Sequence, residues 1–149
     1  MNTIKISDSA ENISAIEFQA FEDEYKLTLP DEYKQFILSK NGGYPDLTLF
    51  VNENDDEFVI NSFSCINFED ADVVSVNDSI LTHQIEEDNI PKYLFPFGLD
   101  AGGNDFCISL KKEDYGKIYK FYQDGRSPEM VYVAQSFQVF INGLKLDEE

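Results

Sequence analysis

The sequence predicts an α+β domain in which helices pack on a mostly antiparallel β-sheet. A pair of helical patterns occupies the N-terminal part of the chain, strand-like segments with short turns dominate the second half, and one helical pattern closes it. Short turns favour antiparallel neighbours, because parallel strands need a long crossover connection. The length of 149 residues, without a repeat or a linker, predicts a single domain over 1–149 with its core at about 9–146.

The first helix is predicted over 9–25. Apolar residues recur there at the helical period, so that one stripe of this helix can face the core. The stripe consists of Ile13, Ile16, Ala20 and Phe21, with Phe18 and Tyr25 beside it.

The second helix is predicted to begin at Pro30 and to end at the asparagine and two glycines of 41–43. Proline suits a first helical turn, where its missing N–H needs no partner, and glycine accepts the left-handed conformation that follows a helix. The buried face of this helix is expected to consist of Tyr33, Phe36 and Ile37.

A β-hairpin is predicted after the helix pair. Its strands, 47–51 and 57–63, are rich in β-branched and aromatic residues, and the acidic turn 52–57 joins them. A third and weaker helical pattern lies within 78–89 and ends before Pro91.

The second half of the chain predicts further strands and a closing helix. Turns that contain glycine separate the first three of these strands. The closing helix, 136–144, carries Phe137, Phe140 and Ile141 at the spacing of one helical face. The strands are predicted at 93–98, 104–110, 117–123 and 130–134.

Negative charge is unevenly distributed along the chain. The formal net charge is -18, and the segment between Lys40 and Lys92 contains twelve carboxylates but no lysine or arginine. Like charges repel one another in a compact chain, so this distribution costs stability. A negative field favours a positively charged partner, whereas direct binding of nucleic acid would need basic side chains. A solvated face that keeps the protein soluble is the alternative interpretation.

We expect the partner-binding surface to lie in this acidic segment. No lysine or arginine nearby in the sequence can pair these carboxylates, so they remain available to another molecule. The turn of the predicted hairpin is the first candidate, and two further acidic clusters follow it. The ten candidate residues are Glu53, Asp55, Asp56, Glu57, Glu69, Asp70, Asp72, Glu86, Glu87 and Asp88.

No motif predicts catalysis, a metal site or a cofactor. His83 is the only histidine and is interpreted as a surface residue on a helix, because a zinc site needs more ligands. Cys65 and Cys107 lie in apolar contexts and are interpreted as buried thiols rather than a disulfide. The turn 52–57 lacks the glycine and the final carboxylate of a calcium-binding loop, which leaves only weak calcium binding open.

The sequence also bears on location. No apolar run approaches the length that crosses a bilayer, and the first residues lack the apolar stretch of a signal peptide. We therefore expect a cytoplasmic protein that does not bind membranes.

Three segments resemble the SUKH superfamily, which includes yeast cell-wall regulators and many bacterial immunity proteins of polymorphic toxin systems. The stretch 27–45 is similar to its opening motif, 94–110 to its central hairpin, and 116–144 to its final strands and closing helix. The matching positions of the opening motif are Leu29, Pro30, Asp31, Tyr33, Phe36, Asn41, Gly42 and Gly43. Those of the later segments are Phe97, Gly98, Gly102, Gly103, Asp105, Cys107, Gly116, Ala134, Ser136, Phe137 and Phe140.

The resemblance implies an α+β fold without enzymatic activity that serves as a binding module. In bacteria it implies a cytoplasmic immunity protein that neutralises a cognate toxin, often a nuclease. The acidity agrees with this, because the active face of a nuclease is basic. The alternative is a non-catalytic regulatory or scaffold module that binds a basic cellular protein.

Overall fold

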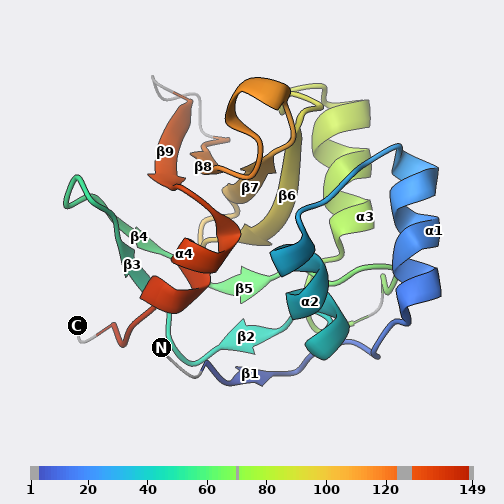
Figure 1. The fold of residues 1–149 in the computed structure, drawn as a ribbon, viewed down its shortest axis with the longest axis horizontal. Coiled ribbons are helices and arrows are strands. Elements are labelled where there is room, and N and C mark those ends of the chain that lie inside the picture. The colour runs from blue at the N-terminus through green and yellow to red at the C-terminus, as the bar shows by residue number, and fades with distance from the viewer. Residues whose placement is uncertain (1–3, 70, 124–128, 148–149) are drawn as a thin grey trace.

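The structure is a computed structural model that describes residues 4–69, 71–123 and 129–147 (Figure 1). Within these ranges four α-helices accompany nine strands in antiparallel sheets, which confirms the predicted α+β class. The largest sheet has five strands in the order β5-β6-β7-β8-β9, so each strand pairs with its neighbour in sequence. These strands are β5 (Ser62–Phe63), β6 (Leu94–Leu99), β7 (Asp105–Ser109), β8 (Ile118–Phe121) and β9 (Met130–Ala134).

Two further sheets have two strands each. In the first, β1 (Ile6–Ser7) pairs with β2 (Tyr44–Pro45), and in the second β3 (Leu49–Val51) pairs with β4 (Glu57–Val59). The predicted hairpin is therefore present, but the single strand predicted over 57–63 is wrong.

The chain leaves the hairpin after Ile60. The Ile60 N–H donates to Thr48 O at 2.9 Å, within the hairpin, whereas the Asn61 N–H donates to Leu99 O at 2.8 Å, in the large sheet. The two halves of the predicted strand thus belong to two different sheets.

Helix α1 (Ala15–Tyr25) begins later than the sequence pattern predicts. Ser14 and Glu17 form a capping box, in which the Ser14 hydroxyl accepts from the Glu17 N–H at 3.1 Å and a Glu17 carboxylate oxygen accepts from the Ser14 N–H at 2.8 Å. The predicted start at residue 9 is therefore wrong.

The predicted apolar stripe of this helix is also wrong in part. Ile16 is 82% exposed and Ala20 is exposed, whereas Phe18 and Phe21 are buried. The register of the buried face is therefore set by the two phenylalanines.

Helix α2 (Asp31–Ser39) follows Pro30, as predicted. Tyr33 and Ile37 are fully buried, which confirms their placement, but Phe36 is only half-buried. The ring of Phe36 still packs against the rings of Phe63 and Phe137, with centroids 4.8 and 5.2 Å away.

The asparagine after helix α2 holds distant parts of the chain together. Asn41 is fully buried, and its amide nitrogen donates to Glu11 O at 2.9 Å and to Ile66 O at 3.0 Å. Its amide oxygen accepts from the Ile66 N–H at 2.8 Å. The helix ends at Ser39, with Lys40 as an extended C-cap, and the predicted left-handed glycine follows at Gly42 rather than directly after the cap.

Glycine is required at positions 42 and 43, because the backbones of other segments lie close to both residues. Gly42 and Gly43 have φ angles of 74° and 130°, in the region that favours glycine. A Cβ atom on Gly42 would lie 2.8 Å from Phe63 O, and one on Gly43 would lie 2.6 Å from Ser7 O. Gly43 and Phe63 exchange two backbone hydrogen bonds at 2.8 and 2.9 Å, which join the small sheet to the large one.

The third predicted helix is present with different bounds. Helix α3 (Val76–Ser79) continues directly into the π-helical segment η1 (Ile80–Glu86), and Figure 1 draws the two as one helix. Its first turn is capped by the Ser75 hydroxyl, which accepts from the Asp78 N–H at 3.0 Å. A short 3-10 helix, η2 (Lys112–Asp114), follows β7, and α4 (Phe137–Gly143) closes the fold as predicted.

The large sheet is covered on both faces. On one face, the ring of Phe137 in α4 lies 5.3 Å from those of both Tyr33 in α2 and Phe97 in β6. On the other face, Ile90 from the segment after η1 packs in a smaller cluster with Leu94, Cys107 and Phe121 of the sheet. Both cysteines are buried and free, which confirms the interpretation of buried thiols.

Candidate functional site

The acidic turn of the β3–β4 hairpin has a defined backbone. The side-chain oxygen of Asn52 accepts from the N–H groups of Asn54 at 2.9 Å and Asp56 at 3.0 Å. The Asn52 N–H donates to Asp56 O at 3.0 Å, which closes the turn. Asp55 takes a φ of 62°, a conformation that aspartate tolerates better than most residues. The turn therefore holds the backbone that carries these carboxylates in one conformation.

Glu53 attaches this turn to the last strand of the large sheet. The Tyr132 hydroxyl in β9 donates to a carboxylate oxygen of Glu53 at 2.8 Å, and the Gln135 amide donates to the same oxygen at 3.3 Å. The backbone N–H of Glu53 and the bond from Tyr132 lower the pKa of Glu53. Burial and the bond to Glu53 raise the pKa of Tyr132 to about 12. Glu53 forms no ion pair with a described residue, but one of its carboxylate oxygens is already bound within the chain, so it is less available to another molecule than the sequence predicts.

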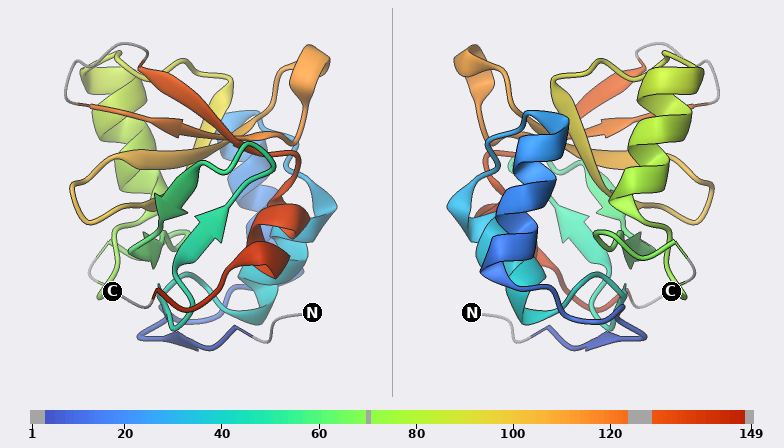
Figure 2. Two further views of the ribbon diagram at one scale, coloured as in Figure 1. Left: turned by 90° about the vertical axis from the view of Figure 1, so that its left-hand side faces the viewer. Right: turned by 90° about the vertical axis from the view of Figure 1, so that its right-hand side faces the viewer.

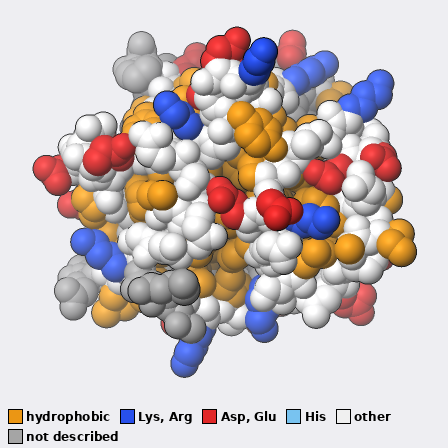
Figure 3. All heavy atoms as spheres, in the orientation of Figure 1, with side chains coloured by type: hydrophobic (Ala, Val, Ile, Leu, Met, Phe, Trp, Pro, Cys, Tyr) orange, Lys and Arg blue, Asp and Glu red, His pale blue; other side chains and the backbone are white. Residues whose placement is uncertain are grey.

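The other three carboxylates of the turn are exposed. Asp55, Asp56 and Glu57 form no ion pair with a described residue. Acidic side chains lie at the left-hand edge of the molecule in Figure 3, where Figure 1 places the tip of the hairpin. These three residues form the acidic tip, the part of the candidate surface that can meet a partner directly.

The second predicted cluster lies between β5 and α3. Glu69 and Asp72 are exposed there, and Asp70 lies outside the described residues. The Tyr44 hydroxyl donates to Asp72 O at 3.0 Å, which attaches the segment to β2. The cluster thus surrounds the entry to α3.

The third predicted cluster lies at the C-terminal end of η1. Glu86, Glu87 and Asp88 are exposed, and Asp88 has a φ of 52°. The carbonyl groups at the end of a helix carry partial negative charge, so three carboxylates at this position oppose the helix dipole.

Neutralising Glu86 and Glu87 as glutamines is expected to raise the free energy of unfolding by about 0.5–1 kcal/mol, because it removes this repulsion. Urea unfolding of the wild-type and E86Q/E87Q proteins measures the change. The matched control is D31N/E32Q in another helix, α2. Its two carboxylates lie in the first turn, at the N-terminal end, where negative charge is favourable. That control should lower the stability, and a change of the same sign in both variants would contradict the explanation.

The three clusters do not form one continuous surface. Figure 1 shows the hairpin on one side of the molecule and the helix that contains η1 on the other. The described residues that lead from β5 to α3 lie on the same side of the molecule as α3. The structure therefore divides the predicted site into the acidic tip and a separate region beside α1 and α3.

His83 takes part in a half-buried polar network, so its interpretation as a plain surface residue is wrong. Its Nδ1 atom lies 3.4 Å from Asp105 Oδ2 and 2.7 Å from Gln123 Nε2. Gln123 also donates to Asp105 Oδ2 at 2.6 Å. Asp105 is fully buried, and its other oxygen, Oδ1, has no hydrogen-bond partner among the described residues. Burial raises the pKa of Asp105 to about 6, against the opposing effect of His83.

A second buried charge lies beside this network. The Lys120 ammonium group is 2.8 Å from Asp100 Oδ2 and lies over the rings of Phe106 and Tyr122. Burial of Asp100 opposes ionisation, but the bonds from Lys120 and Asn104 lower its pKa.

The sequence did not lead us to predict that Asp105 and Lys120 are buried. The available signal was a charged residue within an apolar strand pattern.

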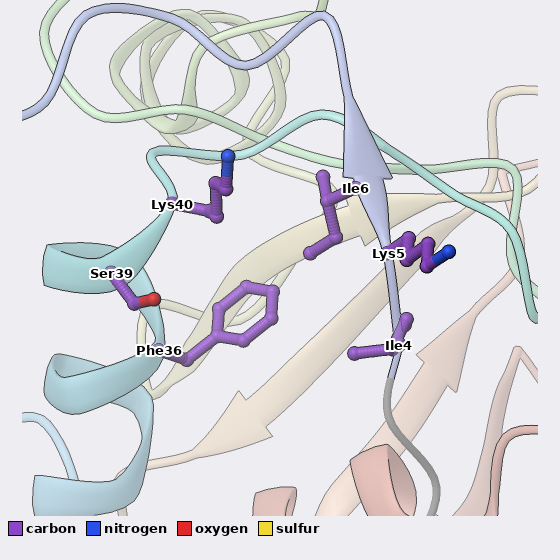
Figure 4. A pocket seen from close by; sticks show the side chains of 6 residues that line it. All are labelled: Ile4, Lys5, Ile6, Phe36, Ser39 and Lys40. Atoms are coloured by element: carbon purple, nitrogen blue, oxygen red, sulfur yellow. The ribbon is translucent and has the colours of Figure 1, made fainter.

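A hollow of about 330 Å³ lies between β1 and α2 (Figure 4). Figure 4 shows the ring of Phe36 directed toward the side chains of Ile4 and Ile6, while the amino groups of Lys5 and Lys40 point away from them. Because these two cations do not converge, the hollow offers no charged pair that could orient an anionic ligand.

Two features are absent from the described residues. They contain no group of three or more His, Cys, Asp or Glu residues that could hold a metal ion. In the same ranges, no helix combines the length and the apolar character needed to span a membrane.

The comparison with known proteins gives one match. The model of the SMI1 / KNR4 family (SUKH-1) matches residues 12–143. The match covers most of the chain and includes all four α-helices, from α1 to the end of α4. No match was found among curated proteins.

Proposed function

This chain belongs to the SMI1 / KNR4 family (SUKH-1), and we propose that it is a non-catalytic immunity protein that neutralises a basic toxin. The toxin class that best suits this acidity is a nuclease, whose active face must be basic to hold phosphates. The protein acts by occupying that face in the cytoplasm, without chemistry of its own.

The observation that carries this proposal is the unpaired state of the exposed carboxylates. Between described residues there are two ion pairs, Lys120–Asp100 and His83–Asp105, and neither involves an exposed acidic cluster. The chain has a formal net charge of -18. Such a field accelerates the encounter with a basic partner, and rapid capture limits the damage that a toxin can do.

The acidic tip suits the first contact. Its backbone is held by Asn52 and its base is attached to β9 through Glu53, so little conformational entropy is lost when a partner binds. Preorganised charges of this kind influence the association rate more than the dissociation rate.

The second candidate function is a scaffold module that binds a basic cellular protein. The same unpaired carboxylates support it. A gene for a toxin next to the gene for this chain favours the immunity protein, and its absence favours the scaffold.

Neutralising the acidic tip as D55N/D56N/E57Q is expected to slow association with the neighbouring toxin about three- to tenfold, because steering depends on local charge density. The control D8N/D23N/E113Q changes the net charge by the same amount at exposed positions elsewhere. It should slow association with the toxin much less. Stopped-flow association rates over a series of salt concentrations measure both. Equal effects of the two variants, or a rate that does not depend on salt, would show that the acidic tip is only a solvated surface.

A further inference from the structure

A hollow separates α1 from the helix formed by α3 and η1. The two helices lie side by side on the same side of the molecule (Figure 2). The hollow measures about 180 Å³, and most of its lining is apolar. Its lining residues are Tyr25, Leu27, Ile80, Gln84, Ile85 and Lys92.

The wall that η1 contributes is rigid. Gln84 is buried, and its amide donates to Pro91 O at 3.0 Å and also to Leu94 O. These bonds attach η1 to the segment that leads into β6. π-Helical segments are rare in proteins, and those that do occur are frequently found at functional sites. The two hydrogen bonds of Gln84 therefore hold this wall of the hollow in place.

Large apolar side chains are exposed beside this hollow. Ile85 is 60% exposed and Leu81, one helical turn earlier, is 46% exposed. Residues four apart on a helix lie on nearly the same face, so the two side chains form one apolar strip along η1. An exposed apolar strip next to a hollow is typical of a protein interface.

Carboxylates lie at both ends of the hollow. At one end, Glu24 directly precedes the lining residue Tyr25, and burial together with the charge of Glu24 raises the pKa of the Tyr25 phenol. At the other end, Ile85 is followed directly by the third acidic cluster, residues 86–88. Lys92 is the one cation among the lining residues. Glu24 on the side of α1 and the third acidic cluster on the side of η1 therefore adjoin the same apolar surface.

We propose that the hollow between α1 and η1 binds an apolar side chain carried on a basic segment of the partner protein. The volume suits one large apolar side chain, and the surrounding carboxylates complement lysine or arginine on either side of it. This inference rests on the proposed function and adds a second contact surface, remote from the acidic tip. Binding energy at protein interfaces is concentrated in such desolvated pockets, whereas charges at the rim mainly supply specificity.

The charge of the hollow's surroundings decides between occupants. A second copy of the chain would bring a further net charge of -18 to an acidic surface, which opposes self-association. A basic segment of another protein meets attraction at both ends of the hollow.

The test uses the full chain and two synthetic helical peptides of equal charge. The first peptide contains lysine and leucine, and the second has serine in place of every leucine. In an NMR titration, the lysine–leucine peptide should shift the amide signals of Tyr25, Leu27 and Ile85 and bind at least tenfold more tightly than the lysine–serine peptide. Equal affinities, or shifts centred on the acidic tip, would overturn the inference.

Matched variants then locate the contact. L81S/I85S should weaken binding of the lysine–leucine peptide at least tenfold, because it removes the apolar strip at exposed positions. The control V59S/V139S changes two exposed apolar residues that lie elsewhere, Val59 at 42% and Val139 at 49% exposure. It should leave the affinity for the lysine–leucine peptide within about twofold of the wild-type value. Equal losses in the two variants would overturn the inference, as would a wild-type dimer in sedimentation that L81S/I85S abolishes.

Neutralisation of the toxin separates this inference from the proposed function. If wild-type protein neutralises the toxin and L81S/I85S does so equally well, the inference fails and the proposed function stands. If the wild-type protein neutralises no toxin encoded beside its gene, the proposed function fails, and the peptide titration still decides whether the hollow binds a basic apolar segment.

Discussion

Replacing Asn41 by alanine is expected to lower the free energy of unfolding by about 3–5 kcal/mol, since it leaves three backbone groups without partners, two of them buried and one half-buried. These groups are the N–H and C=O of Ile66 and the C=O of Glu11, at 2.8–3.0 Å from the Asn41 amide. Each unsatisfied group costs about 1–3 kcal/mol in a protein interior.

Urea unfolding followed by circular dichroism measures the loss at Asn41. N41D retains an acceptor for the Ile66 N–H but cannot donate to the two carbonyl groups, so it should also be strongly destabilised. N12A, at an exposed position, should change the stability by less than about 0.5 kcal/mol. If N41A cost less than about 1 kcal/mol, the role of Asn41 in joining these segments would be refuted.

Asp105 is expected to make the stability of the protein depend on pH. Its folded pKa of about 6 lies above the ordinary value of 3.8, because burial disfavours the charged carboxylate. Between these two values the folded state binds the proton more tightly than the unfolded state does. The contribution of Asp105 to stability therefore falls as the pH rises from about 4 to about 6, by roughly 3 kcal/mol for a shift of about two units.

The variant D105N isolates this contribution, because asparagine does not titrate. The difference in unfolding free energy between D105N and wild type should shift in favour of D105N as the pH rises through this window. Comparing the two proteins at each pH removes the effect of the other carboxylates, which also repel one another more at high pH. A difference that stays constant from pH 4 to pH 7 would exclude the buried carboxylate as its source.

Local sequence patterns predicted most of the fold correctly. Helix α2, helix α4 and the four strands of the second half appear within a few residues of their predicted positions, because apolar periodicity and turn residues act locally. The start of α1 was wrong although Ser14 and Glu17 carry the signature of a capping box. Apolar residues on the N-terminal side extended the helical pattern beyond this signal.

Other features depend on contacts that sequence spacing does not reveal. The glycines at 42 and 43 were correctly singled out, but the backbones that approach them come from β1 and β5. The π-helical form of η1 has no sequence pattern of its own. The ten candidate carboxylates were chosen by local charge density, and only the fold determines that the hairpin carries some of them away from the others.

The β3–β4 hairpin lies outside the five-stranded sheet and contributes only Phe50 and Phe58 to the core from its strands. Its turn can therefore change in sequence without disturbing the pairing of the large sheet. A scaffold with this property can acquire a new specificity through a few substitutions at one tip while the rest of the chain stays constant. The hairpin is accordingly a natural position for grafting a different recognition loop onto this domain.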